Sequence, residues 1–247
     1  MLIVYGLIAG LFSLVGGIAL VWRADLAKKI MIPLLAFAAG SFLGVSFLDL
    51  LPEAVEAVTE PHLVFAAVLF GFFLFFALER FLIQKFHVHG AEHSEHTEAI
   101  AWLVVIGDSF HNLLDGIVIA LVYVANPALG LPTALAIAAH ELPQEIGDFS
   151  ILLDRGWSKA RVIWVNVASS LLSLVGIGIG YYGGTWLAGY LPYLLAIVAG
   201  VFIYIATCDL IPEVQDRAGH KYSYRILGSL FLGLVLTGYL AMLAHGA

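Results

Sequence analysis

Charged residues and cysteines are scarce in this sequence. Only 12% of its 247 residues are charged, and Cys208 is the one cysteine, which excludes an internal disulfide. Soluble domains carry about 25% charged residues, whereas this chain is 62% hydrophobic, with a mean hydropathy of +0.99. No basic segment precedes the first apolar run, so we interpret that run as a retained helix and not as a signal peptide. Together, these features exclude a sizeable soluble domain and predict an all-α polytopic membrane protein.

Apolar runs of about 20 residues are long enough to cross a bilayer as helices. Eight such runs occur, at residues 2–22, 31–52, 62–84, 100–124, 131–153, 161–184, 190–213 and 224–244. With eight spans, all 11 lysines and arginines fall on one side, which the positive-inside rule makes cytoplasmic. We therefore predict one transmembrane domain, residues 1–247, in a cell (plasma or inner) membrane, with both termini outside. We expect the lipid bilayer, and no nucleic acid, among its partners.

One part of the chain is repeated. Residues 36–53 read AFAAGSFLGVSFLDLLPE and residues 196–213 read AIVAGVFIYIATCDLIPE, with 8 of 18 positions identical. Five spans separate the copies, so the copies have opposite orientations, an arrangement typical of secondary transporters. The sequence therefore predicts a 3+2+3 arrangement, in which spans 1–3 and 6–8 form an inverted repeat around spans 4 and 5.

Spans 4 and 5 carry ionisable side chains at membrane depth, where such groups usually face a cavity, a pathway or each other. Asp108, His111 and Asp115 are spaced i, i+3 and i+7 on span 4, so they share one helix face. Span 5 contains HELPQEIGD at residues 140–148. Imidazole and carboxylate ligands suit zinc and similar divalent ions, and the lack of a thiolate cluster disfavours copper(I) and closed structural zinc sites. We therefore expect a metal site between the two spans.

The motifs H-N-L-L-D-G on span 4 and H-E-L-P-Q-E-I-G-D on span 5 resemble the signature of the Zrt/Irt-like (ZIP) divalent-metal transporters. The similarity is greatest to the branch whose fifth helix reads H-E-x-P-H-E-x-G-D. The D-L-[LI]-P-E ends of spans 2 and 7 are also similar to the family.

This resemblance implies a binuclear metal centre between helices 4 and 5. By motif position, the ligands of one metal would be His111, Asp115, His140 and Gln144. The ligands of the neighbouring metal would be Asn112, Asp115, Glu141 and Glu145. Gln144 stands where that branch has histidine, and its neutral amide oxygen is a weaker ligand. The substitution bears on the affinity and metal preference of the first site.

Other polar residues are candidates for a metal pathway, or alternatively are helix-end residues in contact with water. The candidate pathway acids are Asp49, Glu53, Asp108, Asp148, Asp209 and Glu213. The predicted cytoplasmic loop 85–99 is rich in histidine, and such tracts bind metal loosely. Its histidines, His87, His89, His93 and His96, either receive exiting metal or belong to a solvated linker without an essential role.

The predicted function is transport of divalent metal, most of all Zn²⁺ and otherwise Fe²⁺, Mn²⁺ or Cd²⁺. Inward movement is implied by the resemblance. The metal is the transported substrate, and we expect no cofactor and no enzymatic activity. Two alternatives remain open. An intramembrane zinc hydrolase would use His140-Glu141 as the start of H-E-x-x-H, which Gln144 breaks. A metal-responsive channel or sensor is disfavoured by the repeat. Faces of small residues permit a homodimer.

Overall fold

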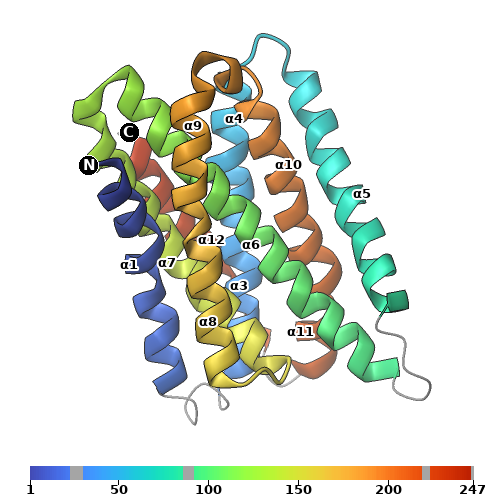
Figure 1. Ribbon diagram of the computed structural model, residues 1–247. Helices are drawn as coiled ribbons and strands as arrows, with labels where there is room; N and C mark the ends of the chain where they lie inside the picture. The colour runs from blue at the N-terminus through green and yellow to red at the C-terminus, as the bar shows by residue number, and fades with distance from the viewer. Residues whose placement is uncertain (23–29, 86–91, 219–222, 246–247) are drawn as a thin grey trace.

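The computed structural model describes residues 1–22, 30–85, 92–218 and 223–245, which form a bundle of long helices without a strand (Figure 1). In chain order the helices are α1 (Leu2–Trp22), α3 (Met31–Val45), α4 (Leu51–Glu56), α5 (Pro61–Lys85), α6 (Glu92–Ala125), α7 (Gly130–Asp154), α8 (Lys159–Ser170), α9 (Leu172–Ala188), α10 (Leu191–Tyr204), α11 (Ile211–Ala218) and α12 (Ser223–His245). Helix α1 begins and α12 ends at the same end of the bundle (Figure 1).

Seven helical segments among the described residues are long and apolar enough to cross a membrane. They are Leu2–Trp22, Met31–Glu56, Pro61–Phe81, Glu98–Ala125, Lys159–Gly184, Leu191–Ala218 and Tyr224–Met242. These segments confirm a polytopic helical membrane protein and match seven of the predicted runs. The remaining run, predicted at 131–153, lies in α7, a helix of 25 residues that continues through Pro143 and contains four acidic residues.

Four helix boundaries differ from the sequence prediction. Helix α6 begins at Glu92, so the second half of the predicted loop 85–99 is helical. The sixth run was expected to be continuous, but it is divided at Leu171 into α8 and α9. The second and seventh runs continue as helix to Glu56 and Ala218, beyond their predicted ends.

The two repeated segments each contain a π-helical turn before a proline. These turns are η1 (Ser46–Leu50), between α3 and α4, and η3 (Ile205–Leu210), between α10 and α11. A proline in a helix has no backbone N–H and clashes with the carbonyl four residues earlier. Just before Pro52 and Pro212, the chain makes wider turns instead, in which Leu51 donates to Ser46 O and Ile211 donates to Ala206 O. The repeated D-L-[LI]-P-E sequences therefore produce the same local irregularity twice.

The inner helices of the bundle are α3 and α10, which contribute many residues to the main hydrophobic core. Phe42 of α3 stacks on Phe202 of α10, with their ring centroids 5.0 Å apart. Helix α3 packs along α12, and α10 packs along α5. Both contacts need glycine, because an added Cβ at Gly40 would lie 2.0 Å from Leu230 O, and one at Gly200 would lie 2.1 Å from Val68 O.

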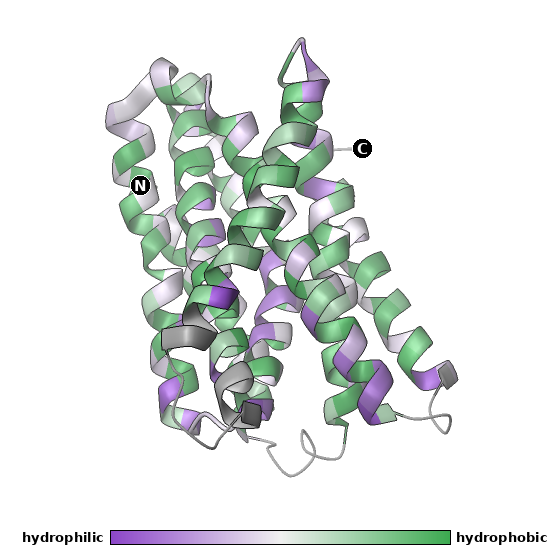
Figure 2. Cartoon of the chain, turned by 90° about the vertical axis from the view of Figure 1, so that its right-hand side faces the viewer, coloured by the Kyte–Doolittle hydropathy of each residue, from purple (hydrophilic) through white to green (hydrophobic). Residues whose placement is uncertain are grey.

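The remaining long helices form the other contacts that place the polar residues. Helix α1 packs along α7, and α6 packs along α9. Hydrophilic residues interrupt the mostly hydrophobic ribbon within the bundle and gather at one of its ends (Figure 2). The polar faces of α6 and α7 are thereby enclosed by apolar helices.

Candidate metal centre

Helices α6 and α7 bring eight of the predicted ligand and pathway side chains into one buried cluster. Each has at most 5% of its surface exposed. The members with described side chains are Asp108, His111, Asn112 and Asp115 on α6, and Glu141, Gln144, Glu145 and Asp148 on α7. His140 lies in α7, but its side chain is outside the described residues. Buried polar groups are costly without partners, so this cluster requires a functional explanation.

A first group of potential ligands consists of His111, Asp115 and Glu141, which can offer atoms within 4.8 Å of one another. His111 Nε2 lies 3.0 Å from Glu141 Oε1 and 3.8 Å from Asp115 Oδ2. The imidazole ring is held from the other side by Phe202, with ring centroids 5.3 Å apart. The spacing on α6, together with Glu141 of α7, therefore places one nitrogen and two carboxylate groups around a common point.

A second group consists of Asp108, Glu141 and Glu145, whose carboxylate oxygens can also lie within 4.8 Å of one another. Glu141 belongs to both groups, so it can bridge two neighbouring positions. Asp108 was expected to be a pathway acid, yet it lies among the potential ligands. The second position therefore contains three carboxylates and no imidazole among its described members.

Asn112 was a predicted ligand of the second position, and the structure gives its amide nitrogen another contact. Asn112 Nδ2 donates to Asp108 Oδ1 at 2.9 Å and approaches Asp108 O at 3.2 Å. The other Asp108 oxygen, Oδ2, accepts a hydrogen bond from Ser169 at 2.5 Å. Asn112 thus orients Asp108, while its own amide oxygen remains on the same side of α6.

Two serines of α8 contact the cluster and were not identified from the sequence. Ser169 donates to Asp108, and Ser170 Oγ lies 3.3 Å from Glu145 Oε1. The sequence did contain a signal, since Ser169, Ser170 and Ser173 interrupt an otherwise apolar run. A hydropathy average over the whole run is dominated by its apolar residues, so it does not reveal these serines.

The cluster contains several acidic side chains, and its two helices contribute no lysine or arginine to it. Neither α6 nor α7 contains a lysine or arginine. Both oxygens of Asp148 and both polar atoms of the Gln144 amide are buried and lack a hydrogen-bond partner among the described residues. A polar cluster left incomplete in this way is suited to a cation that supplies the missing contacts.

The predicted pathway acids outside this cluster have different surroundings. Asp49 lies close enough to Asp115 for their charges to interact. Its repeat counterpart, Asp209, instead lines a cavity of about 460 Å³ between α5 and α10, together with Glu79 and Tyr204. Glu53 is partly exposed at the end of α4. The two repeat copies therefore place corresponding aspartates in unequal environments.

Glu213 belongs to an ion-pair network at the ends of α7 and α11. Arg155 Nη1 donates to Glu213 Oε1 at 2.8 Å, and its Nη2 contacts the second carboxylate oxygen. Arg217 donates to Glu213 Oε1 at 3.1 Å and to Asp154 through both terminal nitrogens. Two arginines thus neutralise Glu213, which distinguishes it from the acids of the buried cluster.

The histidines of the predicted loop cannot be assigned positions. His87 and His89 lie outside the described residues, as do the side chains of His93 and His96.

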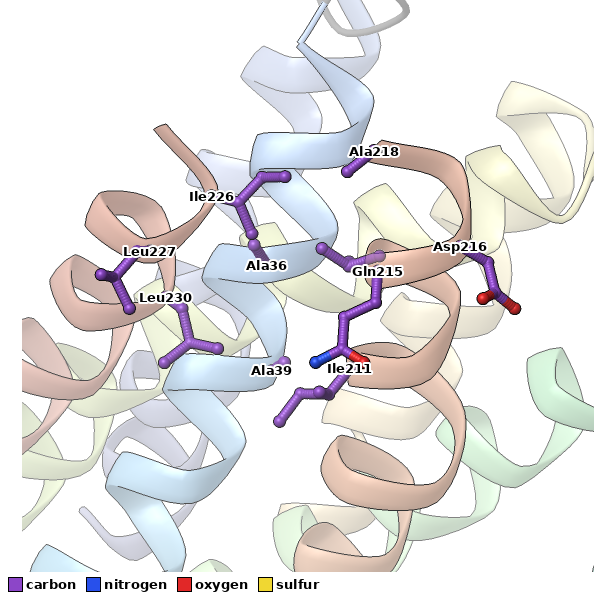
Figure 3. Close-up of a pocket in the computed structure, with 10 residues that line it drawn as sticks. Ala36, Ala39, Ile211, Gln215, Asp216, Ala218, Ile226, Leu227 and Leu230 are labelled. Atoms are coloured by element: carbon purple, nitrogen blue, oxygen red, sulfur yellow. The ribbon is translucent and has the colours of Figure 1, made fainter. Parts of the chain in front are cut away.

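A cavity of about 640 Å³ occurs between α3, α11 and α12 (Figure 3). Its walls are mostly alkyl side chains such as Ile211 and Leu230, and the carboxylate of Asp216 points away from them (Figure 3). The Gln215 amide faces this cavity, whose described lining residues include no group of histidines and acids like that of the buried cluster.

Comparison with known proteins gives a consistent relationship. The sequence profile of the family described as "ZIP Zinc transporter" matches residues 1–99 and 84–245. The chain is 35% identical over 147 residues to zinc transporter ZIP10 of Danio rerio, covering 59% of this chain and 17% of that protein. It is 39% identical over 140 residues to zinc transporter foi of Drosophila melanogaster, covering 55% of this chain and 19% of that protein.

The matched region is therefore less than a fifth of each of these relatives. The family profile, by contrast, extends over almost the whole of this chain. The chain belongs to the ZIP zinc transporter family.

Proposed function

We propose that this protein carries divalent metal ions, above all Zn²⁺, across the membrane into the cytoplasm, by way of a two-metal centre between α6 and α7. The observation that carries the proposal is the buried cluster of carboxylates around His111, on two helices without lysine or arginine. Zinc accepts nitrogen and oxygen ligands, and a divalent ion would neutralise two carboxylates at once.

The two positions differ in their ligands. The first would combine His111, Asp115 and Glu141 with His140 and Gln144, which the sequence motif supplies. The second would use Asp108, Glu141 and Glu145, with Asn112 beside them. Mixed nitrogen and oxygen ligands release zinc more readily than four thiolates do, which suits an ion that must leave its site during transport.

The proposed topology has eight spans, with α7 as the fifth, in a 3+2+3 inverted repeat with both termini outside. The common end of α1 and α12 supports an even number of crossings (Figure 1). The paired π-turns η1 and η3, and the matching contacts of Gly40 and Gly200, support the repeat. An α7 with four acidic residues is acceptable as a span because its polar face is enclosed by other helices.

The proposed route leads inward from Asp49, through the two metal positions, to Asp148 on the cytoplasmic side. Asp49 interacts electrostatically with Asp115, and Asp148 lies two helical turns along α7 from Glu141. The histidines of the 85–99 segment would then receive the ion. We propose a cell membrane as the location, and the faces of small residues permit a homodimer.

Metal flux into proteoliposomes tests this function. Vesicles loaded with a metal-sensitive dye are exposed in turn to Zn²⁺, Cd²⁺, Fe²⁺ and Mn²⁺. We expect saturable zinc entry with wild type, loss of entry with the His111→Ala/His140→Ala double variant, and normal entry with Gln215→Ala, which changes the distant apolar cavity. The absence of flux from wild type, or full flux from the double variant, would refute the proposal.

Gln144 allows a sharper test of metal preference. Its amide is buried beside the acids without a hydrogen-bond partner among the described residues. Replacement by histidine would add a stronger zinc ligand, so Gln144→His should bind zinc more tightly and change the order of metals in the flux assay. An unchanged metal profile would mean that Gln144 does not contact the ion.

The hydrolase alternative is not favoured by these observations. Gln144 removes the second histidine of H-E-x-x-H, and the related proteins carry the names of zinc transporters. Peptide or lipid hydrolysis by purified protein, abolished in Glu141→Gln, would revive that alternative.

A further inference from the structure

The helix that contains Ser169 and Ser170 is interrupted beside the metal cluster. Helix α8 ends at Ser170 and α9 begins at Leu172. Leu171 N donates to Val167 O, whereas Leu174 N donates to Leu171 O only three residues earlier. The expected long helix therefore tightens at this level.

Serine side chains account for the interruption. Ser170 Oγ donates to Asn166 O at 2.9 Å, and Ser173 Oγ donates to Ser170 O at 2.7 Å. Hydroxyls that bond back to helix carbonyls compete with the backbone and bend helices. The interruption lies beside the residues whose hydroxyl groups reach α6 and α7.

Ser169 and Ser170 contact one acid each, Ser169 on α6 and Ser170 on α7. Ser169 Oγ donates to Asp108 Oδ2 at 2.5 Å, and it also lies 3.1 Å from Ser109 Oγ. Ser170 Oγ reaches Glu145 Oε1 at 3.3 Å. Both serines are at most 3% exposed, so water does not replace these contacts readily. The hydroxyls of α8 therefore touch two of the three acids of the second metal position.

These contacts leave each acid with a defined orientation. Asp108 is held at one oxygen by Asn112 and at the other by Ser169. The hydroxyl hydrogen of Ser170 is shared between Asn166 O at 2.9 Å and Glu145 Oε1 at 3.3 Å, so Glu145 is held less firmly, and its Oε2 is buried without a hydrogen-bond partner among the described residues. Each carboxylate oxygen has two lone pairs, so a hydrogen bond can orient a metal ligand and still leave a lone pair for the metal.

We propose that Ser169 and Ser170 are positioning residues that set the metal affinity of the Asp108–Glu141–Glu145 position. The inference rests on the metal-transport function proposed above. The serines orient the ligands through hydrogen bonds and are not themselves ligands. The two serines contact Asp108 and Glu145, which belong to the second group of potential ligands and not to the group around His111, so we expect the first position to depend on them much less.

Cadmium titration of purified protein in detergent, with transport kinetics in proteoliposomes, tests this inference. Wild type should bind two ions per chain. Removing a supporting hydrogen bond typically lowers metal affinity 10–100-fold, so we expect Ser169→Ala to weaken one site about tenfold and the other less than about twofold. Ser170→Ala should act in the same way but less, because its contact is longer. The KM for metal should rise more than kcat falls.

Two further variants separate positioning from packing. Ser169→Thr keeps the hydroxyl and should restore the weaker site. Ser150→Ala is the matched control, because Ser150 is equally buried on α7 but donates only to Ile146 O of its own helix, at 2.6 Å. We expect Ser150→Ala to bind both ions as wild type does.

The outcomes are distinguishable. Wild type that binds no metal would refute the transport function itself. Wild type that binds two ions, with both sites unchanged in Ser169→Ala and Ser170→Ala, would overturn the positioning role alone. Equal weakening of both sites, or the same weakening in Ser150→Ala, would overturn it as well, because a general packing defect would then explain the effect.

Discussion

Acidic side chains occur at two levels of α7, and their neighbours differ. In its middle, Glu141, Glu145 and Asp148 are fully buried on a helix without lysine or arginine. At its end, Asp154 pairs with Arg217, and the adjacent Arg155 pairs with Glu213. The acids in the middle of α7 therefore have no lysine or arginine on α6 or α7, whereas Asp154 at its end is neutralised by an arginine of α11.

This difference separates structural acids from functional ones. An ion pair satisfies both of its members and links two helices, here α7 and α11. Several carboxylates enclosed around His111 are unfavourable in the metal-free protein. Such a cluster is explained if a divalent ion completes it, and the metal would then supply what arginines supply at the helix end.

Glu141 provides the largest expected effect, because it belongs to both groups of potential ligands. Changing a group that only supports a ligand weakens binding 10–100-fold, so Glu141→Gln should reduce zinc uptake more than about 100-fold at low metal concentration. Glu213→Gln, in the paired region, should leave the metal affinity within about twofold. Isotopic zinc uptake by proteoliposomes measures both, and comparable losses would remove the distinction between the two regions.

Replacing Arg155 tests the paired region by removing the basic partner of Glu213. Its side chain is 6% exposed and its partner Glu213 is 21% exposed. Breaking a fully buried pair costs about 3–5 kcal/mol, so we expect Arg155→Ala to destabilise the protein by about 2–3 kcal/mol. Thermal unfolding in detergent measures this, with zinc affinity unchanged. A loss of zinc binding at normal stability would mean that Arg155 supports the metal cluster and not the ion-pair network.

Glu145 should show the opposite effect on stability. Glu145→Gln removes one of several buried like charges, so the metal-free protein should become about 1 kcal/mol more stable. The stabilisation by added zinc should shrink, because the affinity falls. Unfolding curves with and without zinc measure both quantities. A metal-free variant less stable than wild type would mean that Glu145 is a structural acid.

Arg161 should have the smallest effect. Arg161 Nη2 lies 2.9 Å from Glu98 Oε1, and the side chains of Arg161 and Glu98 are 41% and 31% exposed. The Arg161 guanidinium also lies over the ring of Trp157, 3.5 Å from its centroid. Exposed pairs contribute about 0–1 kcal/mol, so a double-mutant cycle of Arg161→Gln with Glu98→Gln should give a coupling below about 1 kcal/mol. A larger coupling would mean that exposure is a poor guide to the worth of these pairs.

Helical periodicity was sufficient to predict part of this site. The i, i+3 and i+7 spacing of Asp108, His111 and Asp115 placed them on one face, and the structure buries all three together. Hydropathy located the spans, since membrane helices are defined mainly by their length and composition. Both signals are local, and they succeed where the structure is regular.

The remaining features depend on contacts between helices, which spacing alone does not reveal. Asn112, a predicted ligand, donates to Asp108, a predicted pathway acid, because the two are one turn apart and the carboxylate points toward it. The interruption at Leu171 comes from serine hydroxyls within an apolar run. The repeat predicted equivalent roles for Asp49 and Asp209, but packing gave them different neighbours.

The central claim is that the acids in the middle of α7 are completed by metal. Anomalous diffraction from crystals of the protein grown with Cd²⁺ tests it directly. The account predicts two strong peaks between α6 and α7, one beside His111 and one between Asp108 and Glu145, with Glu141 touching both. Peaks found only elsewhere on the protein, with none between these helices, would contradict it.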